Sequence, residues 1–232
     1  MKFNYKYIKY YFFVLLKNYL ETKTSYSQHG EDLLVDRIIK PNRINTFLDI
    51  GANDGILFSN TYKFAKDGAK GICLEPSNLT FLKLRLNHLF NFRVKCLKLA
   101  ISDRVGVMYL NESGYENILS TITSYKNKGS YSIKTITLEK LLNDSCNPNS
   151  FDLVSIDVEG FEDKVLEGAG KSLHHCKIVI IEIDKIKIDD AINHPSLSNH
   201  YPAYSNGINL ILLNSNFKFN NPSSLPEGFF RC

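Results

Sequence analysis

The sequence predicts an α/β fold built on a doubly wound, mostly parallel sheet. Short apolar runs of strand length alternate with segments of helical periodicity, which is the order expected of βαβ units. Residues 177–183 are almost wholly aliphatic, as in a strand that a parallel sheet buries on both faces. The strand-like run at residues 47–50 is followed by glycines at Gly51 and Gly55, the layout of a nucleotide-binding βα turn.

Length and composition favour one globular domain. The chain has 232 residues and is 44% hydrophobic and 22% charged, so it can bury a full core. We expect a helical extension at residues 1–24 and one domain at residues 25–232. The net charge of +4 permits an acidic partner without requiring one. The five cysteines are dispersed and form no Cys-x-x-Cys pair, which predicts reduced thiols and a cytoplasmic location.

Residues 1–20 are aromatic and basic. Their unbroken apolar run, residues 10–16, is much shorter than the roughly 20 residues of a membrane span. No small-residue cleavage site follows it. We expect a helix packed on the domain. Membrane contact through residues 1–20, as a helix lying on the bilayer surface, is the alternative that the sequence favours less.

A second helix is expected after Ser27, which can cap it, and Pro41 ends it. Gln28, His29 and Glu31 stand just before the central strand, where a lid or a substrate contact would begin. A plain capped helix explains the same residues.

The first βα turn distinguishes between cofactors. The dinucleotide pattern Gly-x-Gly-x-x-Gly requires a glycine at position 53, and the chain has Asn53. With Asp49 at the strand end and no glycine to admit a pyrophosphate, the turn suits a ligand that has an adenosine but no phosphates. This favours S-adenosylmethionine over NAD. A tight turn without any ligand is the simpler alternative.

The next strand, residues 71–75, ends in Glu75. This residue lies 26 positions after Asp49, close to the spacing of about 20 expected for the acid that binds ribose hydroxyls. Pro76 would then open a helix that carries leucines at positions 79, 82, 86 and 89.

The remaining elements follow in alternation. Strands are expected at residues 92–102, 105–110, 133–136, 151–157 and 177–183, and helices at 59–66, 137–142, 158–166 and 208–213. Residues 184–204 read as irregular, and residues 217–219 and 229–231 as a closing hairpin. Residues 111–129 form a polar excursion that is either functional or a surface loop.

Four acids fall at predicted strand ends: Asp49, Glu75, Asp103 and Asp157. In a doubly wound sheet these ends share one edge, which is where ligands bind. The sequence therefore predicts a binding site at that edge.

These motifs resemble the FkbM family of S-adenosylmethionine-dependent methyltransferases. The resemblance rests on Tyr26-Ser-Gln-His-Gly-Glu-Asp32, Phe47-Leu-Asp-Ile-Gly-Ala-Asn-Asp-Gly55, Glu75-Pro76, Ala100-Ile-Ser-Asp103 and Ser155-Ile-Asp-Val-Glu-Gly-Phe-Glu162. It implies the seven-stranded class I methyltransferase sheet, with an antiparallel strand near the C-terminus. It also implies O-methylation of hydroxyls on sugars, glycans or small metabolites.

The resemblance assigns roles along the chain. The cofactor is expected to contact Asp49, Gly51, Asn53, Gly55, Glu75, Pro76, Ser102, Asp103 and Asp157, with Glu75 on the ribose and Ser102-Asp103 on the adenine side. Asp157 and Glu159 are the candidate catalytic residues, because a carboxylate can take the proton of an alcohol acceptor. Alternatively, Asp157 orients the cofactor amino group and Glu159 caps the next helix. No metal is expected; a divalent ion between Asp157 and Glu159 or Glu182 is an alternative that no ligand spacing supports.

Three other functions are open. RNA ribose 2′-O-methylation could use Lys40, Asp157 and Lys185, although no basic stripe marks a nucleic-acid surface, so nucleic acid is the disfavoured partner. A catalytically silent cofactor-binding domain is a second alternative. A nicotinamide oxidoreductase is a third, which Asn53 disfavours.

Overall fold

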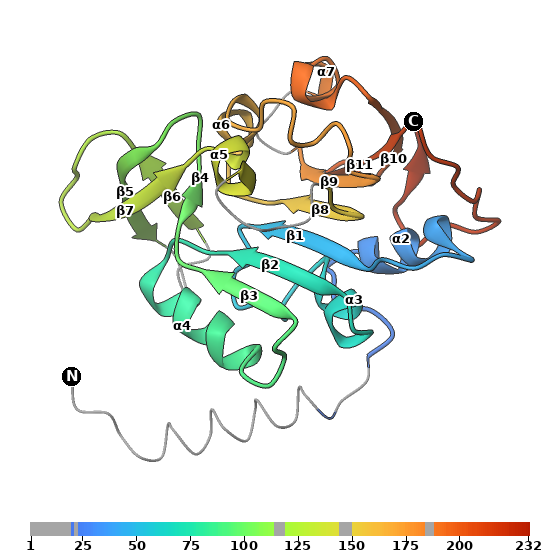
Figure 1. Ribbon diagram of the computed structural model, residues 1–232, viewed down its shortest axis with the longest axis horizontal. Helices are drawn as coiled ribbons and strands as arrows, with labels where there is room; N and C mark the ends of the chain where they lie inside the picture. The colour runs from blue at the N-terminus through green and yellow to red at the C-terminus, as the bar shows by residue number, and fades with distance from the viewer. Residues whose placement is uncertain (1–19, 21–22, 114–118, 144–149, 184–187) are drawn as a thin grey trace.

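The computed structural model describes residues 20, 23–113, 119–143, 150–183 and 188–232. A large sheet lies at its centre, with helices on both faces and a small second sheet at one side (Figure 1). The strands of the large sheet, in spatial order, are β12 (Phe230–Arg231), β10 (His200–Ser205), β11 (Asn209–Asn214), β9 (Ile178–Glu182), β8 (Leu153–Ile156), β1 (Thr46–Ile50), β2 (Lys70–Leu74) and β3 (Val94–Leu97). No helix within the described ranges is long and apolar enough to cross a bilayer.

The strands from β3 to β9 in this order are all parallel, and β11, β10 and β12 add antiparallel pairings at the other end. The predicted α/β class, with a mostly parallel sheet and antiparallel pairing near the C-terminus, is therefore confirmed. The strand count was wrong. β12 adds an eighth strand to the large sheet by pairing with β10.

Helices cover both faces of the large sheet. They are α2 (Glu31–Ile39), α3 (Tyr62–Lys66), α4 (Asn78–Asn87), α5 (Leu138–Asn143), α6 (Glu162–Glu167) and α7 (Ile188–Ile192), with a 3₁₀ turn, η2, at Pro195–Leu197. One core cluster joins β1 and β2 to α5 and α6, and a second joins the opposite face of the strands to α2, α3 and α4. Figure 1 shows these two helical layers on opposite sides of the sheet.

A second sheet of four strands was not predicted. It contains β4 (Ala100–Ile101), β7 (Tyr131–Ile136), β5 (Gly106–Ser113) and β6 (Leu119–Thr123). The single strand expected at residues 92–102 is in fact β3 and β4, which belong to different sheets. Between them the Leu99 amide donates to the Leu97 carbonyl at 3.2 Å, a tight turn that redirects the chain. The polar excursion at residues 111–129 contains β6.

Three other expectations near the C-terminus were wrong. Where a helix was expected at residues 208–213, residues 209–214 form strand β11. An unbroken aliphatic run fits either element, and here both of its neighbours are strands. Residues 217–219 belong to no strand, so the expected hairpin with residues 229–231 does not form. Instead, β12 pairs with β10. The stretch expected to be irregular, residues 184–204, contains α7, η2 and most of β10.

Two helix starts also differ from the expectation. α4 begins at Asn78 with Ser77 as its N-cap, so Pro76 precedes the helix. α6 begins only at Glu162, because Glu159 and Gly160 have φ of 56° and 93°, which an α-helix does not accommodate. Phe161, not Glu159, is the residue before that helix. Of residues 1–24, the structure describes only Leu20, Lys23 and Thr24, so the expected N-terminal helix lies outside the described residues.

Candidate functional site

The carboxyl edge of the parallel strands brings the turns after β1, β2 and β8 together. At the end of β1, the buried Asp49 accepts a hydrogen bond from the Thr61 hydroxyl at 2.6 Å. Burial raises the pKa of Asp49 to about 6, against the opposing effect of that hydrogen bond. This acid therefore supports the turn from beneath rather than lining the open space above it.

Gly51 allows two turns to touch. Its φ is +85°, and a Cβ at this position would lie 1.8 Å from the carbonyl oxygen of Asp157. Any side chain would push the β1 and β8 turns apart. At the other end of the turn, a Cβ on Gly55 would lie 2.5 Å from Leu84 and 2.8 Å from His88, so α4 packs closely against the turn.

Glu75 at the end of β2 is tied to both sides of the turn. One carboxylate oxygen accepts from the Ser77 amide at 2.8 Å, and the other accepts from the Asn53 amide at 3.1 Å. Asn53 reaches this position with φ of 50°, the left-handed conformation that asparagine tolerates better than most residues. Each carboxylate oxygen has more than one acceptor site, so Glu75 can still accept from hydroxyl groups.

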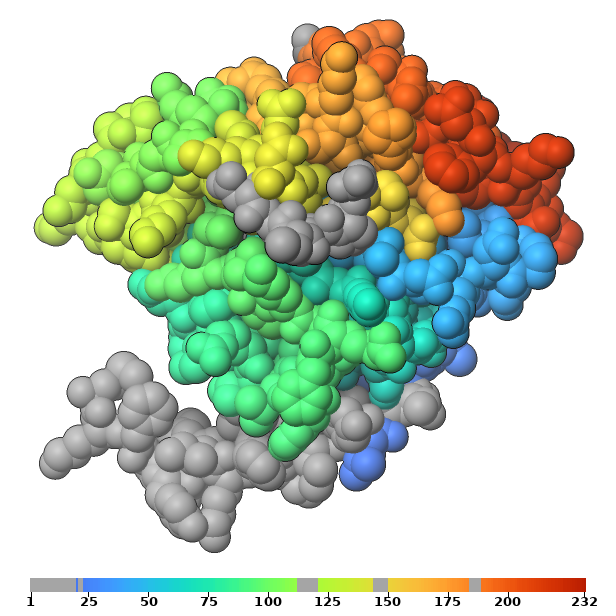
Figure 2. Space-filling view, viewed as in Figure 1, coloured from blue at the N-terminus to red at the C-terminus, as the bar shows by residue number. Residues whose placement is uncertain are grey.

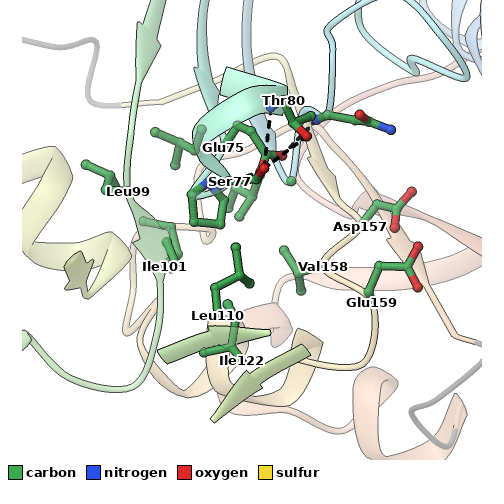
Figure 3. A pocket seen from close by; sticks show the side chains of 16 residues that line it. Glu75, Ser77, Thr80, Leu99, Ile101, Leu110, Ile122, Asp157, Val158 and Glu159 are labelled. Carbon is green, nitrogen blue, oxygen red and sulfur yellow. Dashed lines mark hydrogen bonds between the residues drawn. The ribbon is translucent and has the colours of Figure 1, made fainter. Parts of the chain in front are cut away.

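A pocket opens over these turns (Figure 3). Its polar lining includes Asn53, Glu75, Asp157 and Glu159. Its apolar lining comes from β1, β2, the turn before β4 and the small sheet, and consists of Ile50, Leu74, Leu99, Ala100, Ile101, Leu110 and Ile122. Gly51, Pro76, Ser77, Thr80 and Val158 complete it. Figure 3 shows the carboxylates of Asp157 and Glu159 beside one another, away from Leu110 and Ile122.

Negative charge is concentrated around Asp157. Burial by surrounding protein atoms raises the pKa of Asp157 well above its ordinary value, and the carboxylates of Glu182, Glu159, Asp49 and Glu162 act in the same direction. Asp157 is nevertheless exposed on the side that faces the pocket, so solvent there moderates the rise. The result is a carboxylate that takes up a proton more readily than an ordinary aspartate.

Glu162 holds the turn that carries these acids. It is buried, and one of its carboxylate oxygens accepts from the amides of both Val158 and Gly160, each at 3.1 Å. Glu159 lies between those two amides with φ of 56°, a strained conformation for a side chain with a Cβ. Sequence reasoning did not select Glu162 for the site. Its position three residues after Glu159, inside the same motif, was the available signal.

The structure brings some predicted residues to the pocket and leaves others outside it. Gly51, Asn53, Glu75, Pro76, Asp157 and Glu159 line it, and Asp49 and Gly55 lie next to it in the same turn. Ser102 and Asp103 are not among the lining residues. The Ser102 hydroxyl donates to Asp103 at 2.9 Å, and Arg104 lies 3.4 Å from that carboxylate.

The expected lid residues lie near β11 rather than along the pocket lining. Glu31 is fully buried and accepts from the side-chain amides of Asn206 at 3.1 Å and Asn209 at 2.7 Å. It also accepts from the His29 backbone amide at 3.0 Å. Gln28, His29 and Glu31 do not contribute to the lining of the described pocket, and a lid role for them stays a prediction.

The tetrad needed for ribose methylation is not assembled by the described residues. Lys40 follows the end of α2 and leads toward the start of β1, whereas Asp157 lies at the opposite end of the sheet. Lys185 lies outside the described residues. In the described part of the chain, no group of three or more His, Cys, Asp or Glu side chains is placed to hold a metal ion.

A family model describes the same region. The model for the methyltransferase FkbM domain matches residues 49–217, which include the turns after β1, β2 and β8. The chain belongs to this family. S-adenosylmethionine is accordingly its cofactor. The pocket suits it, because Glu75 offers acceptors beside an apolar wall and the described lining residues include no lysine or arginine that would bind phosphates.

Comparison with solved structures gave matches at low sequence identity. A methyltransferase FkbM from Methylobacillus flagellatus is 12% identical with a TM-score of 0.48, and the match covers 73% of this chain and 43% of that one. The chain thus spans less than half the length of that protein. A TehB-like SAM-dependent methyltransferase from Corynebacterium glutamicum is 10% identical with a TM-score of 0.46, covering 89% and 96% of the two chains.

An O-methyltransferase from Bacillus cereus in complex with SAH is 14% identical with a TM-score of 0.45, covering 91% of each chain. A search of curated proteins gave no significant match.

Proposed function

We propose that this chain transfers the methyl group of S-adenosylmethionine to a hydroxyl group of a sugar, glycan or small metabolite. The observation that carries the proposal is the pair of carboxylates, Asp157 and Glu159, at one side of a pocket whose other side combines Glu75 with an apolar wall. The pocket thus has separate places for an adenosine and for reacting groups.

The adenosine half of the pocket would bind through complementary chemistry. Glu75 accepts from the ribose hydroxyls, because a carboxylate can accept from two hydroxyls at once. Leu99, Ile101 and the Leu110–Ile122 pair from the small sheet form the apolar surface that an adenine ring requires. The methionine end would then lie toward the turn after β8, which carries Asp157 and Glu159.

When bound, the cofactor supplies a methyl group that its sulfonium already activates. The protein therefore has to align the acceptor oxygen with the methyl carbon and remove the hydroxyl proton. The acceptor oxygen would take the methyl group from the sulfur of the cofactor, and the hydroxyl proton would pass to a carboxylate. Asp157 is suited to this step, because its surroundings raise its pKa toward the range in which a general base is efficient.

The test is a screen for methylated product. The protein is incubated with S-adenosylmethionine labelled in its methyl group and with panels of glycans, small alcohols and RNA, and products are analysed by mass spectrometry. We expect label on a glycan or small alcohol. Label on RNA alone would favour the ribose methyltransferase, and cofactor binding without label on any acceptor would favour a silent domain.

The variant Asp157→Asn tests the chemical role, because it keeps the shape and removes the charge. Loss of a general base typically lowers turnover by 10²–10⁴-fold, and we expect cofactor affinity to change much less. The matched control is Asp163→Asn, an exposed acid on α6 outside the pocket, which should leave turnover unchanged. If affinity for the cofactor falls in step with turnover, Asp157 serves binding and not proton transfer.

A further inference from the structure

An exposed apolar surface lies on the outer side of α4 and the turn that follows it. The inward side of this helix buries Thr80, Leu84 and His88, at a spacing of four residues. A second apolar stripe faces outward instead. Its exposed members, here called the α4 surface, are Leu79, Leu82, Leu89, Phe90 and Phe92, with 94% of Phe92 accessible to solvent.

Basic residues accompany the α4 surface along the sequence. Residues 76–98 contain five basic side chains and no acid, and Arg85, Arg93 and Lys95 are exposed. Residues 1–20 repeat this composition, with four lysines, no acid and many aromatic residues. The rest of the chain, residues 21–75 and 99–232, holds all 24 acids and 19 of the 28 basic residues. Its net charge is therefore −5. The charge of this protein is therefore strongly polarised.

The first described residues of the domain lie on the face that carries α4. The Lys23 amide donates to the Tyr26 hydroxyl at 3.2 Å. The ring centroids of Tyr26 and Tyr62 are 4.8 Å apart, and those of Tyr62 and His88 are 5.7 Å apart. Contacts of described residues therefore connect Lys23 to the last turn of α4. In Figure 2 the atoms of residues 76–98, coloured teal to green, lie in the lower part of the described molecule, near the blue atoms of the first described residues.

We propose that the α4 surface docks on a membrane that contains anionic lipids, with residues 1–20 as a second contact. The exposed phenylalanines enter the interfacial region, while the surrounding cations are attracted to lipid headgroups. A second copy of this chain fits less well, because pairing two such surfaces would bring like charges together. The same repulsion opposes a covering of the α4 surface by residues 1–20, which the sequence predicts to pack on the domain without indicating where.

The proposal is independent of methyl transfer and is tested by co-sedimentation with vesicles. The full chain is mixed with vesicles of phosphatidylcholine alone or of phosphatidylcholine with phosphatidylserine, at low and high salt. We expect binding to the anionic vesicles only, and weaker binding as salt rises. Absence of binding to the anionic vesicles would overturn the proposal.

Two variants separate the apolar contribution from the electrostatic one. Phe90→Ser/Phe92→Ser removes the exposed rings, and we expect vesicle affinity to fall at least tenfold. Arg85→Gln/Arg93→Gln/Lys95→Gln removes three charges, each contributing about fivefold at an anionic surface, so affinity should fall by about two orders of magnitude. These side chains are exposed, so the unfolding temperature should not change.

Matched controls lie on other surfaces. Val107→Ser/Phe230→Ser changes two exposed apolar residues, and Lys134→Gln/Lys140→Gln/Lys171→Gln changes three exposed lysines. We expect neither to alter vesicle binding, and an equal loss in these controls would show that the α4 surface has no special role.

Deletion of residues 1–22 distinguishes a membrane from two other possible partners of the α4 surface, which are residues 1–20 and a second copy of the chain. The proposal expects the truncated chain to bind vesicles more weakly than the full chain but still to depend on Phe90 and Phe92. Stronger binding after deletion would mean that residues 1–20 cover the α4 surface. A dimer that Phe90→Ser/Phe92→Ser dissociates, without vesicle binding by the full chain, would assign the surface to a second copy. Either result overturns the proposal.

Discussion

Asp49 should reduce the stability of the fold at neutral pH, and Asp49→Asn should restore it. Asp49 is 4% exposed, and its carboxylate accepts a hydrogen bond from the Thr61 hydroxyl at 2.6 Å. Burial penalises the charged form and raises the pKa of Asp49 from its ordinary value of 3.8 to about 6. Asparagine keeps an oxygen that can accept from Thr61 and carries no charge.

The sign of the effect follows from proton binding. Between pH 3.8 and about 6 the folded chain retains a proton on Asp49 that the unfolded chain has lost, so stability falls as pH rises through this window. At 1.36 kcal/mol per pKa unit, the penalty is about 1 kcal/mol at pH 4.5 and about 3 kcal/mol at pH 7.5. The free energy of unfolding of Asp49→Asn relative to the wild type should therefore increase by about 2 kcal/mol between these two pH values.

The comparison across pH removes a confounding term. Burying the extra amide hydrogens of asparagine has its own cost, but this cost is the same at both pH values and cancels in the difference. The chain has no tryptophan, so urea unfolding is best followed by far-ultraviolet circular dichroism. Asp67→Asn, at an exposed acid, is the matched control. An advantage of Asp49→Asn that is equal at both pH values, or larger at pH 4.5, would refute the reasoning.

Further substitutions test the turns around the pocket. Glu162→Ala should lower the free energy of unfolding by about 2–4 kcal/mol, because the amides of Val158 and Gly160 lose their acceptor, and Glu162→Gln should lower it less. Urea unfolding of the wild type and both variants measures this, and free energies that agree within about 0.5 kcal/mol would contradict it. Glu75→Ala should weaken S-adenosylmethionine binding by about 1–3 kcal/mol in calorimetry, with no binding of NAD, and unchanged affinity would place the ribose elsewhere. Asp103→Asn, measured in the same calorimetric assay, tests whether the loop after β4 contacts the cofactor. The sequence predicts that this variant binds S-adenosylmethionine more weakly.

The sequence was most informative where local pattern and burial agree. The strands β1, β2, β8 and β9 are short aliphatic runs that end in polar residues, and a parallel sheet buries such runs on both faces. Gly51 was identifiable because a turn that touches another backbone excludes a side chain. The carboxyl edge of the sheet, and with it Glu75 and Asp157, could therefore be located before the structure was known.

The sequence was least informative where tertiary packing decides the outcome. Leu110 and Ile122 reach the pocket from the small sheet, and no local pattern indicates that β5 and β6 fold toward β4. The helical periodicity of the α4 leucines was genuine, but it did not reveal that Leu84 faces inward and Leu79 and Leu82 face solvent. In β11, an aliphatic run without turn signals inside it fits a helix and a strand equally well.

The position of β11 between β9 and β10 affects how the chain can fold during synthesis. The backbone of β9 pairs with β8 on one side. On its other side it stays unpaired until residues 209–214, which form β11, have left the ribosome. Until then Ile178–Glu182 is an aliphatic edge strand, the kind of edge that pairs with other chains. A chain that stops before residue 209 would keep that edge permanently open. The last tenth of the polypeptide therefore protects the centre of the sheet from aggregation.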